Sequence, residues 1–62
     1  MIITQHEKRS GAMCLEAVDR FGNTLAHISL NDIEYERFVD YAAAVGTETA
    51  FWDFKAEELE AA

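Results

Sequence analysis

The 62-residue sequence contains no proline, three glycines and a single cysteine, Cys14. One cysteine excludes an intramolecular disulfide, which favours a reducing compartment. Apolar runs are short, such as the four residues 42–45, whereas a membrane-spanning helix needs about 20 residues. The N-terminus lacks the basic segment and the apolar stretch of a signal peptide. We therefore expect a cytoplasmic protein that does not contact a membrane.

Basic residues are scarce, and the second half of the chain has almost none. Residues 1–30 hold three acids and three bases, whereas residues 31–62 hold nine acids against Arg37 and Lys55, which accounts for the whole net charge of −7. An acidic surface repels nucleic acid and steers a protein toward basic surfaces. The few bases form no stripe, so we expect no direct binding of nucleic acid. The expected partner is a basic protein.

The length of the chain predicts one compact domain over residues 1–62. Half of the residues are apolar and seven are aromatic, which is enough for a small core. A deep substrate pocket needs roughly 300 Å³ or more, and a core of this size leaves few residues to build one. Size therefore favours a binding surface over an enclosed active site. Small domains also complete their cores by association, which leaves a homodimer open.

The first half of the sequence is typical of strands. Residues 12–18 and 24–30 have the length and composition of paired strands. In the loop between them, Asp19 can accept hydrogen bonds from the turn backbone, and Gly22 supplies a positive φ. Residues 1–7 are expected to add a third strand, which makes a three-stranded antiparallel meander. Alternation groups the following residues on one face of each paired strand: Met13, Leu15 and Ala17 in the first, Ala26, Ile28 and Leu30 in the second.

The periodicity changes at Asn31, where a capping box begins. Asn31 stands at the N-cap and Glu34 three residues later, so each side chain can bond the free backbone amide of the other residue. The helix is expected to run to about Val45, because Gly46 offers the left-handed conformation that ends many helices. A turn of 100° per residue places the following side chains on its apolar face: Tyr35, Phe38, Tyr41, Ala42 and Val45.

The last segment is expected to form a second, short helix. Residues 56–60 are rich in good helix formers, and Thr47 or Thr49 can cap a helix. A fourth strand over residues 50–55 stays open, because the apolar residues there also alternate. The expected fold class is α+β, with a three-stranded antiparallel β-meander followed by one long helix and a second short helix that cover one sheet face.

Three acids of the first helix, Asp32, Glu36 and Asp40, are four residues apart and fall in one row opposite the apolar face. Like charges at this spacing cost roughly 0.2–0.5 kcal/mol per pair, so the helix itself gains nothing from them. A rigid row of carboxylates presents charge much as a phosphate backbone does, and a DNA-binding groove would accept it. The alternative is a solvated face that keeps the protein soluble. The acids expected to extend this surface are Asp53, Glu57, Glu58 and Glu60.

Aromatic residues cluster in the segment Phe51-Trp52-Asp53-Phe54. Core packing is the favoured interpretation, because a small chain needs its largest side chains for burial. The alternative is an interface anchor, for which Trp52 is the best candidate and Tyr35 a second one. Tyr35 and Tyr41 can likewise lie at the edge of the core with their hydroxyls outward.

The sequence contains no catalytic or metal-binding motif. His6, Cys14 and His27 come from three expected strands, but none has a ligand spacing such as C-x₂-C or H-x₃-H. We therefore expect ordinary sheet residues there, with no metal and no cofactor. Ser10, Ser29 and Cys14 lack a nucleophile context such as G-x-S-x-G. Without a convergent polar cluster, an enzyme is not expected.

A short, acidic, single-domain chain without a catalytic motif resembles the small phage-encoded inhibitors of CRISPR–Cas systems in size, charge and α+β build. Several members of that group are DNA mimics. The resemblance implies a partner such as the large subunit of a type I Cascade complex, bound where it reads target DNA or the PAM, in the host cytoplasm. The expected function is inhibition of a nucleic-acid-binding partner by charge mimicry. The alternative is a non-catalytic structural or regulatory module, antitoxin-like or a homodimeric accessory protein.

Overall fold

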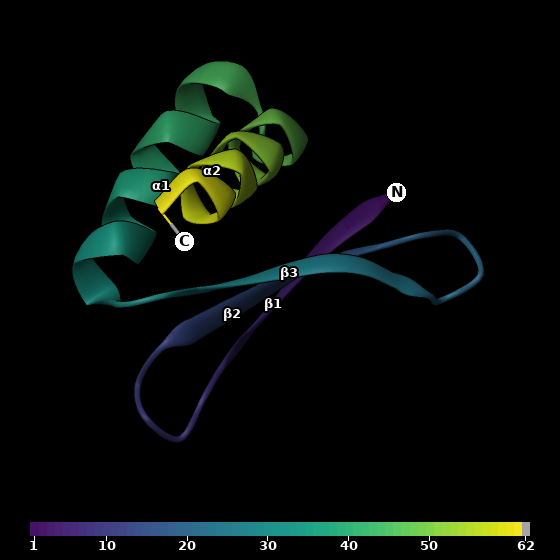
Figure 1. Ribbon diagram of the computed structural model, residues 1–62, viewed down its shortest axis with the longest axis horizontal. Helices are drawn as coiled ribbons and strands as arrows, with labels where there is room; N and C mark the ends of the chain where they lie inside the picture. Colours follow the sequence, from purple (N-terminus) through teal and green to yellow (C-terminus); the bar gives the residue numbers. More distant parts are fainter. Residues whose placement is uncertain (62) are drawn as a thin grey trace.

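A computed structural model describes residues 1–61, with side chains described as far as Leu59. Three strands form an antiparallel sheet in the order β1-β2-β3: β1 (Ile2–Glu7), β2 (Met13–Val18) and β3 (Thr24–Leu30). Two helices follow, α1 (Asp32–Val45) and α2 (Thr47–Ala61), and both lie on one face of the sheet (Figure 1). The expected α+β meander with two C-terminal helices is confirmed.

Asp19 closes the β2–β3 hairpin, as the sequence predicts. Its Oδ1 accepts the backbone amides of Phe21 at 2.8 Å and Asn23 at 2.9 Å, and its Oδ2 accepts the side-chain amide of Asn23 at 3.2 Å. These hydrogen bonds hold the pKa of the Asp19 carboxyl below its usual value, and the bond from the Asn23 backbone amide has the largest effect. Gly22 has a φ of 86°, which glycine adopts without a steric penalty.

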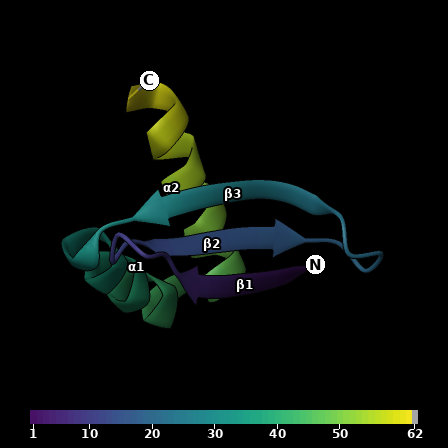
Figure 2. The ribbon, with the colours of Figure 1, turned by 90° about the horizontal axis from the view of Figure 1, so that it is seen from below.

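The register of the sheet separates a covered face from an open one. β1 pairs with β2 from Ile2 opposite Val18 to Glu7 opposite Met13, and the β2–β3 pairing is interrupted by an irregularity at Ala17/Val18. Alternate residues therefore point toward the helices or away from them. Figure 2 is seen from the open face, and α2 crosses behind all three strands there.

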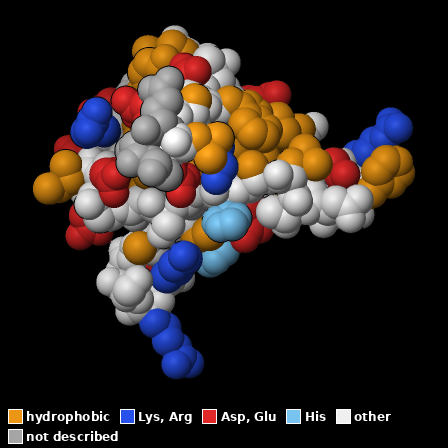
Figure 3. Space-filling model, viewed as in Figure 1, with side chains coloured by type: hydrophobic (Ala, Val, Ile, Leu, Met, Phe, Trp, Pro, Cys, Tyr) orange, Lys and Arg blue, Asp and Glu red, His pale blue; other side chains and the backbone are white. Residues whose placement is uncertain are grey.

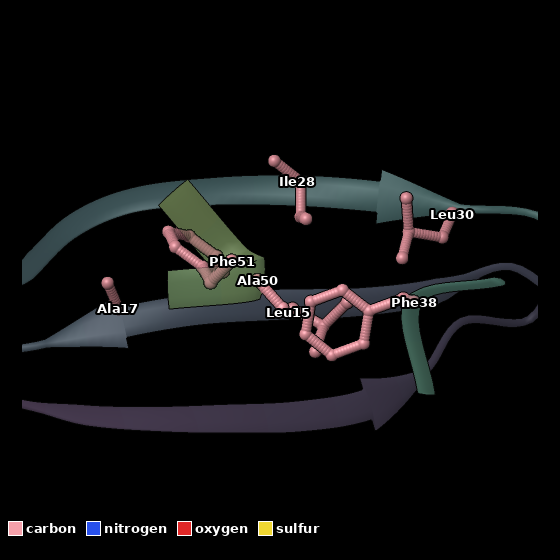
Figure 4. Packing of buried hydrophobic residues seen from close by; sticks show 7 residues of the cluster. All are labelled: Leu15, Ala17, Ile28, Leu30, Phe38, Ala50 and Phe51. Carbon is pink, nitrogen blue, oxygen red and sulfur yellow. The ribbon is translucent and has the colours of Figure 1, made fainter. Parts of the chain in front are cut away.

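The core fills the space between the covered sheet face and the helices (Figure 4). In α2, Phe51 is completely buried, and Phe54 packs edge-to-face on Phe38 of α1 with ring centroids 5.3 Å apart. The sheet face that alternation assigned to Leu15, Ala17, Ile28 and Leu30 is therefore the buried one. In the aromatic segment 51–54, Phe51 and Phe54 pack in or against the core, as favoured. The buried core consists of Leu15, Ala17, Ile28, Leu30, Phe38, Ala50 and Phe51.

The capping box of α1 is present as predicted. The Glu34 amide donates to Asn31 Oδ1 at 2.8 Å, and the Asn31 amide donates to Glu34 Oε1 at 3.1 Å. Two of the orphan amides at the start of the helix are satisfied in this way. The local sequence therefore determines the residue at which α1 begins.

The predicted apolar face of α1 is only partly correct. Phe38 is buried, and Tyr35 and Ala42 are half-buried against the core. Tyr41 and Val45 are instead 40% and 41% exposed. The physical reason is that α2 crosses the strands and occupies much of the covered sheet surface (Figure 2). The side of α1 that carries Tyr41 consequently faces α2 and solvent.

A single residue, Gly46, joins the two helices. Its amide donates to the carbonyl of Ala42 at 2.8 Å, and its own carbonyl accepts the amide of Ala50 at 3.0 Å. Gly46 therefore occupies the N-cap position of α2, where the sequence predicted Thr47 or Thr49. Its φ of 98° is positive as expected, but its ψ of 149° lies outside the left-handed helical region. This conformation is essentially restricted to glycine.

α2 is a continuous helix of 15 residues, against 14 in α1, so it is not short as predicted. The open alternative of a fourth strand is wrong. Ala50, Phe51 and Phe54 fall on one side of a helix and together fill the space over the sheet, whereas strand alternation would divide them between two faces. Over the described residues, neither helix combines the length and hydrophobicity that a bilayer crossing requires.

Candidate partner-binding surface

The excess negative charge lies on the helices, whereas the sheet and its hairpin loops carry equal numbers of acids and bases. The bases of the first half lie in the hairpin loops, with Lys8 and Arg9 after β1 and Arg20 after β2. Figure 3 shows basic side chains protruding at two ends of the molecule and acidic ones spread over the helical layer. The acids of the second half of the sequence therefore give the two helices an acidic outer surface, called here the acidic helical layer.

α1 and α2 enclose an open groove of about 770 Å³, called here the helix groove. Three predicted site acids from two different helices come together in it, Asp40 from α1 and Asp53 and Glu57 from α2. Arg37 is the one basic residue among its lining residues, so the groove keeps a negative formal charge. Among the described residues, the groove is lined by Arg37, Asp40, Tyr41, Ala44, Asp53, Phe54, Ala56 and Glu57.

A hydrogen bond across the helix groove reports its negative potential. The Tyr41 hydroxyl donates to Asp53 Oδ2 at 2.6 Å. The pKa of Tyr41 is raised above its usual value, mainly because this bond holds the phenolic proton. Partial desolvation and the negative charges of Asp53 and Glu57 raise it further. Ionisation of Tyr41 would break the bond and add a further negative charge to the groove.

A second hollow continues the acidic surface toward the sheet. Arg37 and Glu57 line both hollows, and the second one adds Glu34 and Glu58. Sequence reasoning missed Glu34 as a surface residue, because its capping role already explained it. Glu34 is three residues before Arg37, so the two side chains lie on the same side of the helix. This spacing could have predicted that Glu34 belongs to the same surface as Arg37. The lining of the second hollow is Ile28, Ser29, Leu30, Glu34, Arg37, Phe54, Glu57 and Glu58.

Only part of the predicted row on α1 lines the two hollows described above. Asp32, Glu36 and Asp40 are all exposed, but only Asp40 lines a hollow. A step of four residues overshoots a full helical turn, so the row rotates by about 80° between its ends. Of the acids predicted on α2, the side chain of Glu60 lies outside the described residues.

Few of these acids are neutralised by neighbouring bases. Between the described side chains, the one ion pair joins Lys55 Nζ to Glu58 Oε2 at 3.6 Å. Lys55 Nζ also donates to the backbone carbonyl of His27 at 3.0 Å, on the exposed edge strand β3. An exposed pair of this kind contributes about 0–1 kcal/mol. The carboxylates of the helix groove therefore remain available to external cations.

The two aromatic anchor candidates occupy different environments. Trp52 is 38% exposed, and its ring packs edge-to-face on Phe51 with centroids 5.1 Å apart. Tyr35 is half-buried, and its hydroxyl donates to Gln5 Oε1 at 3.0 Å. Trp52 does not line the helix groove. Apolar side chains gather between the start of α2 and β1 in Figure 3, so the molecule has an apolar surface beside its acidic one.

Comparison with known proteins found no match to this chain among protein-family models, curated proteins or solved structures. The fold and the helix groove define a small α+β protein with an acidic helical layer.

Proposed function

We propose that this chain binds a basic, nucleic-acid-binding protein through its acidic helical layer and blocks the access of DNA. The convergence of Asp40, Asp53 and Glu57 in one groove carries the proposal. The resemblance to CRISPR–Cas inhibitors narrows the partner to an effector complex, such as the large subunit of a type I Cascade complex.

The groove is suited to receive Lys or Arg side chains from a partner. Its carboxylates are mounted on two helices that the core holds in place, so little ordering is needed on binding. The Tyr41–Asp53 hydrogen bond orients one carboxylate in advance. A surface of one sign also steers a basic partner and raises its association rate by roughly 10- to 1,000-fold.

The test measures the binding of purified type I effector complexes to the immobilised chain across a range of salt concentrations. The double reversal Asp40→Lys/Glu57→Lys is expected to lower the association rate at least about tenfold at low salt. The double reversal Glu7→Lys/Glu48→Lys changes the net charge equally at exposed acids outside the groove, and serves as the control. Circular dichroism establishes that both variants fold.

In the same experiment, the chain is expected to compete with target DNA for the effector complex. Failure of every effector complex to bind would reject the CRISPR partner. Binding that is insensitive to salt, or equally weakened by both double reversals, would reject the helix groove as a DNA mimic.

A second candidate function, a non-catalytic interaction module, is favoured by the exposed ring of Trp52. A side chain of this size with more than a third of its surface in water is a typical interface anchor. Self-association through this surface would depend on Trp52 and hardly on salt. Light scattering of the unaltered chain and of Trp52→Ala, each at low and high salt, distinguishes this function from charge mimicry.

A further inference from the structure

We propose that the open face of the sheet carries a transition-metal site, with His6, Cys14 and Glu16 as ligands and Zn²⁺ as the metal that fits best. One imidazole nitrogen, the thiol sulfur and one carboxylate oxygen of these residues all lie within 4.8 Å of one another. The site is on the sheet face opposite the helices, so it is independent of the helix groove and of the function proposed for it.

The strand register brings the three residues together. His6 of β1 is paired directly with Cys14 of β2, and Glu16 follows Cys14 by two positions on the same strand. Residues two apart in a strand share a face, and directly paired residues on antiparallel strands have neighbouring side chains. Seven residues separate His6 from Cys14 along the chain, so no metal motif is visible in the sequence.

The donor set matches the chemistry of zinc. Zn²⁺ is bound in proteins by cysteine sulfur, histidine nitrogen and carboxylate oxygen, usually in a tetrahedral arrangement. Donor atoms around a tetrahedral Zn²⁺ are about 3.3–3.6 Å apart, given ordinary metal–ligand distances. Small rotations of the side chains would therefore close the present arrangement around the ion. On binding, the thiol of Cys14 loses its proton to solvent.

A fourth ligand is available on β3. His27 is paired with Glu16 across the β2–β3 ladder, so its side chain lies next to Glu16 on the open face. Both histidine side chains, coloured pale blue, are visible below the helical layer in Figure 3. Rotation of the exposed His27 imidazole completes a four-ligand site, and a water molecule fills the position otherwise.

The ligand atoms are free for this role. None of the side-chain hydrogen bonds or ion pairs between described residues uses His6, Cys14 or Glu16. Cys14 is only 4% exposed, so bulk water is largely excluded from its side chain. Glu16 is half-buried, and the exposed His6 leaves a route for the ion. A metal here would cross-link β1 to β2 and stabilise a small sheet.

The first measurement uses Co²⁺ as a spectroscopic substitute for Zn²⁺ in the full, unaltered chain. A tetrahedral site with one cysteine is expected to give visible d–d bands and a near-ultraviolet thiolate-to-cobalt charge-transfer band. Both should saturate at one Co²⁺ per chain and disappear when Zn²⁺ is added. Absence of the charge-transfer band would overturn the proposal, and this result does not depend on whether any variant folds.

Variants then assign the ligands by calorimetric titration with Zn²⁺. Cys14→Ser, His6→Gln and Glu16→Gln are each expected to weaken Zn²⁺ binding at least about tenfold. Glu7→Gln removes the same charge as Glu16→Gln from a β1 residue outside the cluster, and it should leave binding unchanged. Zn²⁺ should also raise the melting temperature of the unaltered chain but not that of Cys14→Ser. Equal affinity in all four variants would overturn the assignment, whereas a loss confined to the three ligand variants supports it.

Discussion

The hydroxyl of Tyr41 in α1 donates a 2.6 Å hydrogen bond to Oδ2 of Asp53 in α2, and this contact links the two helices at their groove. Tyr41 is 40% exposed, and its ring lies 6.1 Å from that of Phe54 between centroids, so it occupies the core-edge position that the sequence left open for it. The contact combines a structural role, holding α1 against α2, with an electrostatic one, since it orients a groove carboxylate.

The raised pKa of Tyr41 predicts a loss of stability in alkali. The folded state holds the phenolic proton more tightly than the unfolded state, because the proton is shared with Asp53. The stabilisation is therefore complete below the ordinary tyrosine pKa of about 10 and is lost as the pH rises through the folded-state pKa. The tyrosinate absorbance of the native chain should show a component with a raised pKa that is missing in Tyr41→Phe. If the tyrosinate titrations of the native chain and Tyr41→Phe differ only in amplitude, the Tyr41–Asp53 hydrogen bond does not persist in solution.

Replacement of Gly46 tests the joint between the helices. Gly46→Ala is expected to lower the free energy of unfolding by about 1–3 kcal/mol, because its φ of 98° and ψ of 149° strain any residue with a Cβ. No heavy atom lies within 4 Å of an added Cβ, so the loss would come from backbone strain alone. Gly46→Asn discriminates further, since asparagine tolerates the left-handed helical region but not this one. Urea denaturation should therefore show similar losses of stability in Gly46→Ala and Gly46→Asn. A Gly46→Asn variant clearly more stable than Gly46→Ala would contradict the backbone conformation described for Gly46.

Two adjacent aromatic residues of α2 should differ strongly in their contribution to stability. Phe51 is completely buried, so Phe51→Ala is expected to lower the free energy of unfolding by about 3–5 kcal/mol, which is comparable to the whole stability of a domain this small. Trp52 is 38% exposed, and Trp52→Ala should lose no more than about half as much.

Thermal and urea denaturation measure both aromatic variants. Phe51→Leu retains most of the buried volume and remains measurable if Phe51→Ala does not fold. Equal losses for Phe51→Leu and Trp52→Ala would be inconsistent with the burial of the two side chains.

Elements determined by neighbouring residues were predictable. The Asp19 hairpin loop and the Asn31–Glu34 capping box each rest on side chains that bond backbone within four residues. Strand alternation also identified the buried sheet face, because a period of two depends only on the backbone. These features were therefore readable from the chain and are confirmed.

Elements determined by the packing of distant segments were not predictable. The path of α2 across the sheet exposes Tyr41 and Val45, and packing on the sheet makes residues 50–55, which the sequence left open between helix and strand, part of one long helix. The sequence also could not show which acids of the predicted row on α1 line the groove, since only the side of the helix that faces α2 contributes to it. Of that row, Asp40 alone meets Asp53 and Glu57.

By itself, the amino-acid sequence determined where the strands and α1 begin and end and on which half of the chain the negative charge accumulates, because hydrogen bonds, periodicity and composition act over a few residues. Only the tertiary structure decided which charges and ligands meet. The helix groove joins acids of α1 and α2, and the open sheet face joins His6 to Cys14 and Glu16. Both sites depend on how strands and helices are placed against one another, and that placement is set by burial of the whole core rather than by any local pattern.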